Sequence, residues 1–344
     1  MRATKLILLE GVPGSGKSTL AQTLLRHLHR QGIAATWWYE EDVHHPLYIF
    51  HDEVSLRQIL DDLSGGHYRR VVAQALTQWQ RFADDLRDAE GVVLLDSCLF
   101  GYLTWSLFPL EVPEQEIHAY LAAVERIVAP IDPCLIYLYQ DDMARSLRRV
   151  CDHRGVDIEQ AYIQRVEESA YGKRRGLRGF DGLVTYWTAY REITDAAFSA
   201  ISWPRLAIET SAGAWHDYQC QVLDFLDLPP VADGVDVAED LERFVGLYRS
   251  VDNDPSITCT VSLKEGSLLL DELPEVWPHA RLLPKAPSVF DVASLPIEVS
   301  FEVDAAEDTV TMTVAGPHLF GGEVAGTFRA VLPGFTLPVA DVFA

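Results

Sequence analysis

Basic side chains are scarce in this sequence. Lysine and arginine together number 28, against 51 aspartates and glutamates, and the formal net charge is −23. A field of this sign repels polyphosphate backbones, so we expect no nucleic acid among the partners. Acidic residues outnumber basic ones most clearly from Val231 onward, and we interpret that excess as a solvated acidic surface.

Cysteines and long apolar runs are also scarce. No apolar run approaches roughly 18 residues, so no segment is predicted to span a membrane. The apolar stretch near the start leads directly into a glycine-rich loop, which differs from the layout of a signal peptide. The scattered, odd-numbered cysteines form no C-x-x-C pair, which argues against a disulfide framework or a zinc site. These absences together predict a cytoplasmic protein. The cysteines are Cys98, Cys134, Cys151, Cys220 and Cys259.

The strongest motif lies between residues 5 and 28. A short apolar run over residues 6–9 predicts a buried strand. The next segment, GVPGSGKS, matches G-x-x-x-x-G-K-[ST] at every position, and leucines at every fourth residue then predict an amphipathic helix. Strand, loop and helix in this order are typical of a phosphate-binding site. The residues predicted to bind the nucleotide here are Gly11, Val12, Pro13, Gly14, Ser15, Gly16, Lys17, Ser18 and Thr19.

The residue types of this loop suit a nucleoside triphosphate. Glycines let backbone N–H groups approach phosphate oxygens closely, and the helix that follows presents its free amides and positive dipole end to the charge. Lys17 is placed to bridge the β- and γ-phosphates, and Ser18 to put its hydroxyl on Mg²⁺. We therefore expect ATP and Mg²⁺ as cofactors.

The rest of the first two thirds alternates between strands and helices. Strands are predicted at 6–9, 34–40, 91–96, 134–139 and 205–210, and helices at 67–89, 114–129, 181–201 and 215–227. This alternation predicts an α/β fold with a five-stranded parallel sheet, a P-loop NTPase. It ends at Leu228-Pro229-Pro230. We expect a first domain at 1–228, a linker at 229–237 and a second domain at 238–344.

The second domain has a different pattern, because apolar residues there alternate with polar ones. Ile257 to Leu263 and Leu268 to Leu270 predict a hairpin around Lys264-Glu265-Gly266. Residues 299, 301 and 303 are expected to pair with 310, 312 and 314 across an acidic loop at 304–308. The pattern predicts a small antiparallel sheet or barrel, without a catalytic constellation.

Carboxylates follow two of the predicted parallel strands, at the edge where ligands bind in open α/β sheets. Glu40, Glu41 and Asp42 come after the second strand, and Asp96 ends the third. An aspartate at that place commonly holds Mg²⁺, so Ser18 and Asp96 are the predicted metal-binding residues. Adjacent histidines, as at 44 and 45, make a poor metal pair.

A basic segment interrupts this acidic chain between residues 141 and 178. Spacings of three and four place Arg145, Arg148 and Arg149 along one side of a helix. Arginine is suited to forked contacts with phosphate, so the segment is predicted to bind an anion. The alternative is a helix face paired with its own acids, such as Asp141 or Asp152.

These residues resemble the P-loop kinases of small metabolites, particularly the thymidylate kinase and deoxynucleoside kinase group. The resemblance implies that Glu40 acts as base on the acceptor hydroxyl, with Asp42 as the alternative, and that Asp96 handles Mg²⁺. In that group the aspartate is usually followed by arginine, where this sequence has Ser97. The departure leaves nucleoside specificity open.

The same resemblance implies that the segment 141–178 is a lid, whose Arg148, Arg149 and Arg154 contact ATP phosphates. The pieces EEDVHHP, YLYQDDMARSLRRVCDHRG and AYGK also resemble a group of bacterial kinase-like P-loop proteins. The C-terminal region loosely resembles the lipocalin-like barrels that are appended to some bacterial enzymes.

The function expected from these observations is ATP-dependent transfer of a phosphoryl group to a hydroxyl of a small molecule. The acceptor, such as a nucleoside, nucleotide, antibiotic or metabolite, is not identified by the sequence. The catalytic residues would be Lys17, Glu40 or Asp42, Asp96, Arg148 and Arg154. The alternative is a regulatory NTPase switch whose β domain binds a protein, although no N-K-x-D tetrapeptide is present. A homo-oligomer is left open.

Overall fold

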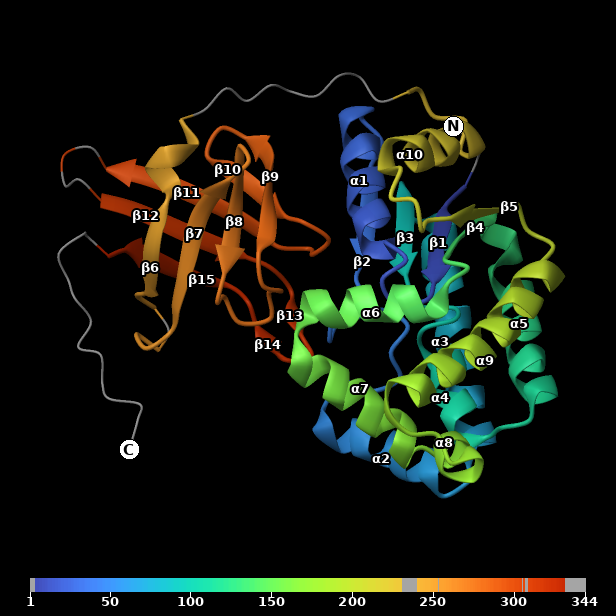
Figure 1. Ribbon diagram of the computed structural model, residues 1–344. Helices are drawn as coiled ribbons and strands as arrows, with labels where there is room; N and C mark the ends of the chain where they lie inside the picture. The colour runs from blue at the N-terminus through green and yellow to red at the C-terminus, as the bar shows by residue number, and fades with distance from the viewer. Residues whose placement is uncertain (1–3, 231–239, 253, 305, 307–308, 332–344) are drawn as a thin grey trace, which may run out of the picture. The chain divides into compact units, whose positions relative to one another are not determined.

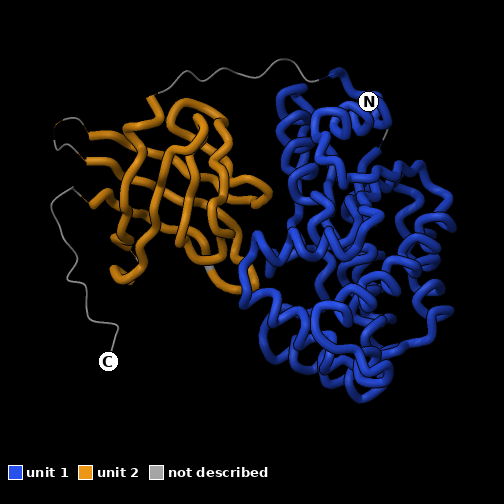
Figure 2. The backbone as a smooth tube through the Cα atoms, in the orientation of Figure 1, with its two compact units in different colours: residues 1–234 blue, residues 235–344 orange. Residues whose placement is uncertain are grey.

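The computed structural model describes residues 4–230, 240–252, 254–304, 306 and 309–331. The chain forms two compact units, residues 1–234 and 235–344 (Figure 2). Of the linker expected at 229–237, residues 231–237 lie outside the described residues.

The first unit contains a five-stranded parallel sheet with the strand order β2-β3-β1-β4-β5 (Figure 1). Its strands are β1 (Leu6–Gly11), β2 (Ala35–Trp38), β3 (Val92–Asp96), β4 (Pro133–Tyr139) and β5 (Arg205–Glu209). All five were expected from the sequence. Central strands of a parallel sheet are covered on both faces, which explains the continuous apolar run of β1.

Helices connect and cover these strands. They are α1 (Lys17–Arg30), α2 (Glu53–Ser64), α3 (Tyr68–Asp88), α4 (Leu103–Leu107), α5 (Glu114–Val128), α6 (Met143–Arg154), α7 (Val156–Glu168), α8 (Ala170–Arg175), α9 (Gly179–Ala200) and α10 (Trp215–Phe225). Helix α2 was not predicted. It begins with a reciprocal cap, in which the Asp52 carboxylate accepts a hydrogen bond from the Ser55 amide at 2.7 Å. Helices α4, α7 and α8 were also not predicted individually.

The core of the first unit lies mainly between the sheet and α3, α5 and α9. Leu6 and Leu8 of β1 join this core together with Trp79 of α3 and Tyr190 of α9. Trp79 donates a hydrogen bond from its indole nitrogen to the Tyr120 hydroxyl at 2.9 Å, which satisfies a polar atom deep in the core. Ile7 and Leu9 point to the other face because side chains alternate along a strand, and that face packs against α1.

The second unit is a closed antiparallel barrel of eight strands. Neighbouring strands follow chain order, and pairing of the last strand with the first closes the ring. The strands are β6 (Gly246–Ser250), β7 (Thr258–Lys264), β8 (Ser267–Asp271), β9 (Ala280–Ala286), β10 (Val289–Val292), β11 (Glu298–Asp304), β12 (Thr309–Ala315) and β15 (Gly326–Ala330). Two short strands, β13 (His318–Leu319) and β14 (Gly322–Glu323), form a separate pair.

The predicted pairing in the second unit is confirmed residue by residue. Val299 lies opposite Val314, and Phe301 lies opposite Met312. The third pair, at 303 and 310, has the same register. Aromatic rings fill the interior, where Phe244 and Phe301 stack with centroids 4.5 Å apart. The expected hairpin is β7 and β8, with Glu265 and Gly266 at the turn.

Among the described residues, no helix is long and apolar enough to cross a membrane. In the first unit, every strand expected from the sequence has its carboxyl end at one edge of the sheet, because all five run parallel. That edge carries the phosphate loop, defined here as residues 11–18. The candidate site lies at this edge.

We predict that a chain of residues 1–230 folds by itself, because the sheet and its covering helices lie within one compact unit. The expected result is a single cooperative transition in urea unfolding followed by circular dichroism. ATP affinity, measured by calorimetry, should match that of the full chain. Insoluble protein would show that the two units share a folding unit.

Candidate functional site

The phosphate loop joins β1 to α1 and turns through left-handed backbone at three glycines. Gly11, Gly14 and Gly16 have φ of 148°, 75° and 96°. A Cβ on Gly11 would lie 2.0 Å from the Leu138 carbonyl oxygen, and one on Gly14 would lie 2.2 Å from Cγ2 of Val150. Space and backbone conformation therefore both require glycine at these two positions.

Polar contacts from other elements hold the loop in place. The Thr210 hydroxyl donates to the Ser15 carbonyl at 3.0 Å, and Nε2 of Gln140 donates to the Gly14 carbonyl at 3.2 Å. The Ser146 hydroxyl on α6 lies 3.4 Å from the Pro13 carbonyl. Within the loop, the Ser15 amide donates to the Val12 carbonyl at 3.2 Å. Thr19 follows in the first turn of α1.

Lys17 and Ser18, which follow the last of these glycines, lie at the carboxyl edge of the sheet. Lys17 is only 8% exposed, and its Nζ donates to the Val12 carbonyl at 3.3 Å. The Ser18 hydroxyl lies near the Asp96 carboxyl and lowers its pKa. Parallel pairing places Leu9 opposite Asp96, so the sheet register itself brings this carboxylate beside the loop.

Asp96 is fully buried, and its environment favours the protonated form. Burial raises its pKa to about 7, and the charge of Glu40 adds to that shift. Lys17 and the hydrogen bonds from Ser18 and Ser97 act in the opposite direction. The Oδ2 atom is buried without a hydrogen-bond partner among the described residues.

This oxygen and the Ser18 hydroxyl fit a hard divalent cation such as Mg²⁺, which prefers oxygen ligands. In the part of the chain that the structure describes, no group of three or more His, Cys, Asp or Glu side chains could hold a metal ion. The protein would thus contribute few ligands. Phosphate oxygens and water would complete the coordination, as is usual for Mg²⁺ at nucleotide sites.

The two candidate bases differ in their surroundings. Glu40 lies close enough to Asp96 for its charge to act on that carboxyl. Asp42 is 9% exposed, and its Oδ1 accepts a hydrogen bond from the His44 amide at 2.9 Å, which closes a local turn. Of the aromatic run before them, Trp37 and Tyr39 belong to the buried core.

The lid arginines have different partners. Arg148 donates to both carboxylate oxygens of Glu159 at 3.0 Å and lies 3.7 Å from the Phe180 ring centroid. Arg149 donates to Oε1 of Gln140 at 2.7 Å. Because Gln140 itself donates to the Gly14 carbonyl, Arg149 is connected to the phosphate loop through this one side chain. The structure thus joins Arg148 to Glu159, a carboxylate of the neighbouring helix α7, and not to Asp141 or Asp152.

Arg154, at the end of α6, donates to the Tyr162 hydroxyl at 2.7 Å. Burial raises the pKa of Tyr162, and the charges of Glu40 and Glu41 contribute to the shift. Arg154 and Tyr162 therefore lie near the acidic loop after β2. Of the predicted lid residues, Arg149 and Arg154 are brought toward the candidate site.

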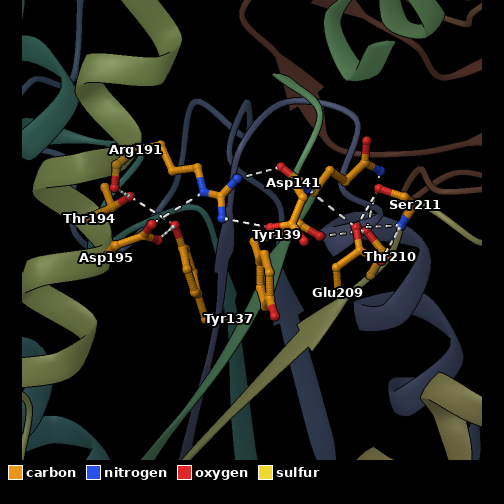
Figure 3. A network of polar contacts seen from close by, with 10 residues as sticks. Tyr137, Tyr139, Asp141, Arg191, Thr194, Asp195, Glu209, Thr210 and Ser211 are labelled. Atoms are coloured by element: carbon orange, nitrogen blue, oxygen red, sulfur yellow. Dashed lines mark hydrogen bonds and ion pairs between the residues drawn. The ribbon is translucent and has the colours of Figure 1, made fainter. Parts of the chain in front are cut away.

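A network of polar contacts fixes the start of the lid (Figure 3). Arg191 of α9 donates to the Gln140 carbonyl at 2.6 Å and lies 3.3 Å from carboxylate oxygens of both Asp141 and Asp195. On the other side, Oε1 of Glu209 accepts a hydrogen bond from the Asp141 amide at 3.4 Å. Residues 140 and 141 are thus tied to α9 and to the end of β5.

Glu10 is a fully buried residue that sequence analysis did not single out. It ends the apolar run of β1, and its Oε1 accepts a hydrogen bond from the Leu99 amide at 2.6 Å. Burial raises its pKa to about 8. This carboxyl group ties the segment after Asp96 to the strand that precedes the phosphate loop. The signal in the sequence that could have identified Glu10 is an acidic residue within an otherwise apolar strand.

A second missed contact joins the loops after β2 and β3. Nε2 of His45 lies 3.1 Å from Sγ of Cys98, and that sulfur lies 3.2 Å from the Asp96 carbonyl oxygen. The Leu47 amide donates to Nδ1 of His45, which leaves the proton of a neutral ring on Nε2. Burial lowers the pKa of His45 to about 3 and raises that of Cys98, so both groups are neutral.

Comparison with known proteins adds little to this geometry. No family model matches the chain, and no curated protein does. Among solved structures, a thymidylate kinase from Candida albicans has 14% identity and a TM-score of 0.34, and covers 65% of this chain and 91% of its own. A shikimate kinase from Acinetobacter baumannii, in complex with shikimate, has 14% identity and a TM-score of 0.33. The match covers 65% of this chain and 93% of the shikimate kinase chain.

Both likenesses are too distant to bear on activity. The class rests on the strand order β2-β3-β1-β4-β5 and on the glycine-rich loop between β1 and α1. These features define a P-loop α/β fold, and the second unit is an antiparallel barrel.

We predict that Glu10→Ala lowers the free energy of unfolding by about 1–3 kcal/mol, because the buried Leu99 amide loses its acceptor. Glu10→Gln is the matched control, since its amide oxygen can still accept that hydrogen bond. Urea unfolding of the three proteins measures the difference. Equal losses in both variants would contradict the role given to the Leu99 contact.

We predict that stability falls as pH rises through the window set by the two buried carboxyls. Their folded-state pKa values of about 7 and 8 exceed the ordinary 3.8 and 4.5, so the folded chain holds protons that the unfolded chain has lost. Urea unfolding at a series of pH values, without Mg²⁺ and nucleotide, tests this. Asp96→Asn should flatten the decline, and an unchanged slope would contradict the assignment.

Proposed function

We propose that this protein is an ATP-dependent kinase that transfers the γ-phosphoryl group of ATP to a hydroxyl of a small-molecule acceptor. The observation that carries the proposal is the convergence of Lys17, Ser18, Asp96 and Glu40 at one edge of the sheet. Phosphoryl transfer depends mainly on positioning and on charge stabilisation, and this edge concentrates groups that serve both purposes.

The nucleotide phosphates would lie on the backbone N–H groups of the phosphate loop and at the start of α1. Lys17 would exchange its hydrogen bond to the Val12 carbonyl for contacts to the β- and γ-phosphates. Ser18 and Asp96 would hold Mg²⁺, which neutralises charge that develops on the phosphate oxygens during transfer. Arg149 and Arg154 would add positive charge from the lid.

Glu40 is the better candidate for the base. Its carboxylate acts electrostatically on Asp96, whereas the Asp42 carboxylate is occupied by the turn at His44. A base must reach the acceptor hydroxyl beside the transferred phosphoryl group, which favours the residue nearer to Asp96. Arg148 is assigned a lesser part than the sequence suggested, because Glu159 already neutralises it.

The proposal is tested by incubating the full chain with labelled ATP and a panel of nucleosides, sugars, aminoglycosides and amino-acid derivatives. We expect label to pass to a hydroxyl compound, and ATP hydrolysis to stay slow until that compound is added. A regulatory switch would instead hydrolyse the nucleotide at the same rate with or without an acceptor. That outcome would overturn the kinase assignment.

We predict that Lys17→Ala weakens ATP binding at least tenfold, because charge-assisted contacts to the phosphates are lost. Calorimetric titration with ATP and Mg²⁺ measures the affinity. Thermal unfolding of the same sample should show that the variant is folded. Wild-type ATP affinity in a folded variant would refute the placement of the phosphates.

We predict that Glu40→Gln lowers the rate of transfer about 10²–10⁴-fold while ATP affinity stays unchanged, because only the proton acceptor is removed. Asp42→Asn is the matched variant, and it should keep transfer within a few-fold of wild type. Turnover of the acceptor found in the panel provides the readout. If the two variants exchange these behaviours, Asp42 is the base.

A further inference from the structure

Trp215 is a large aromatic residue that stays exposed beside the phosphate loop. It is the first residue of α10, and 42% of it is accessible to solvent. Single exposed apolar side chains are common on protein surfaces, so exposure alone indicates no function. What distinguishes this indole is its direct contact with the loop that is proposed to hold the nucleotide phosphates.

The indole packs on Gly16 of the phosphate loop. A Cβ on Gly16 would lie 2.0 Å from Cη2 and 2.7 Å from Cζ3 of Trp215. Any larger residue at position 16 would therefore collide with the ring. Because Gly16 directly precedes Lys17, the six-membered ring of the indole borders the part of the loop that is assigned to the phosphates.

The turn between β5 and α10 fixes the indole to the same loop. The Thr210 hydroxyl donates to the Ser15 carbonyl at 3.0 Å, and the Trp215 amide donates to the Gly213 carbonyl at 2.9 Å. The indole also makes a T-shaped contact with the Tyr218 ring, at a centroid distance of 5.5 Å and an interplanar angle of 87°. The ring is thus held in place before any ligand arrives, which lowers the entropic cost of binding one.

The chemistry of a nucleotide limits where its base can lie. In a nucleoside triphosphate, one sugar separates the base from the α-phosphate. With the phosphates on the N–H groups of the loop, the base must therefore lie within one sugar's length of that loop. An exposed aromatic ring in contact with the loop offers a stacking surface there, since every nucleobase presents a flat π face.

We infer that the base of the donor nucleotide stacks on the Trp215 indole, so that this side chain selects a nucleoside triphosphate over a polyphosphate without a base. The inference rests on the proposed function, because that function places the phosphates on residues 11–18. It adds the binding site for the base. The base is at the far end of the nucleotide from the γ-phosphate, so Trp215 contributes affinity and takes no part in the transfer itself.

The experiment compares ATP with tripolyphosphate, which has the same phosphate chain without a sugar or a base. Each is titrated with Mg²⁺ into the full chain, and calorimetry measures the affinity. In wild type, ATP should bind more tightly than tripolyphosphate. Trp215→Ala should weaken ATP binding about fivefold or more, the loss typical when a stacked aromatic ring is replaced by alanine, and should leave tripolyphosphate binding unchanged.

Three further variants assign the difference to the ring. Trp215→Phe should keep part of the ATP preference, because a smaller aromatic face remains. Trp215→Leu should lose it although an apolar side chain still covers Gly16, and this variant decides should Trp215→Ala fail to fold. The matched control is Phe320→Ala, which removes a ring that is 52% exposed from the second unit. It should bind both ligands as wild type does.

Two outcomes would overturn the inference. One is that folded Trp215→Ala keeps wild-type ATP affinity. The other is that ATP and tripolyphosphate are weakened equally, which would show that the indole only supports the loop. The transfer assay is separate from these titrations. If no acceptor is phosphorylated while Trp215→Ala weakens ATP alone, the kinase assignment is refuted and the base site stands.

Discussion

The contact between the Ser18 hydroxyl and the buried Asp96 carboxyl is the interaction on which the rest of the candidate site depends. It joins the first turn of α1 to the end of β3, two elements far apart in the sequence. Parallel pairing of β1 with β3 makes it geometrically available, because Leu9 and Asp96 share a register. Any shift of that register by one residue would turn the carboxylate to the other face of the sheet.

Burial gives this edge its electrostatic character. Glu10 and Asp96 are carboxyl groups in a region that water does not reach, and each has an oxygen without a hydrogen-bond partner among the described residues. An isolated buried negative charge is costly, so such groups need a cation, a donor or a proton. Lys17 supplies part of that compensation in the structure, and Mg²⁺ would supply more under the proposed function.

The arginines of the lid have different partners in the structure. They look alike in sequence, yet Arg148 is neutralised by Glu159, whereas Arg149 reaches Gln140 beside the phosphate loop. Arg165 stacks on an indole instead. Helical spacing tells which arginines share a face. It does not tell what the neighbouring helices α7 and α9 place opposite them, and those partners decide whether a positive charge remains available to a ligand.

The sequence by itself determined the phosphate loop, the five parallel strands and the register of β11 against β12. These follow from short-range patterns: glycine spacing, apolar runs and period-two alternation, which report local geometry directly. Tertiary structure alone decided barrel closure, which depends on pairing between the first and last strands. It also decided the contact of Glu10 with Leu99 and that of Cys98 with His45. Each of these joins side chains from separate loops, and no local pattern records which loops the fold brings together.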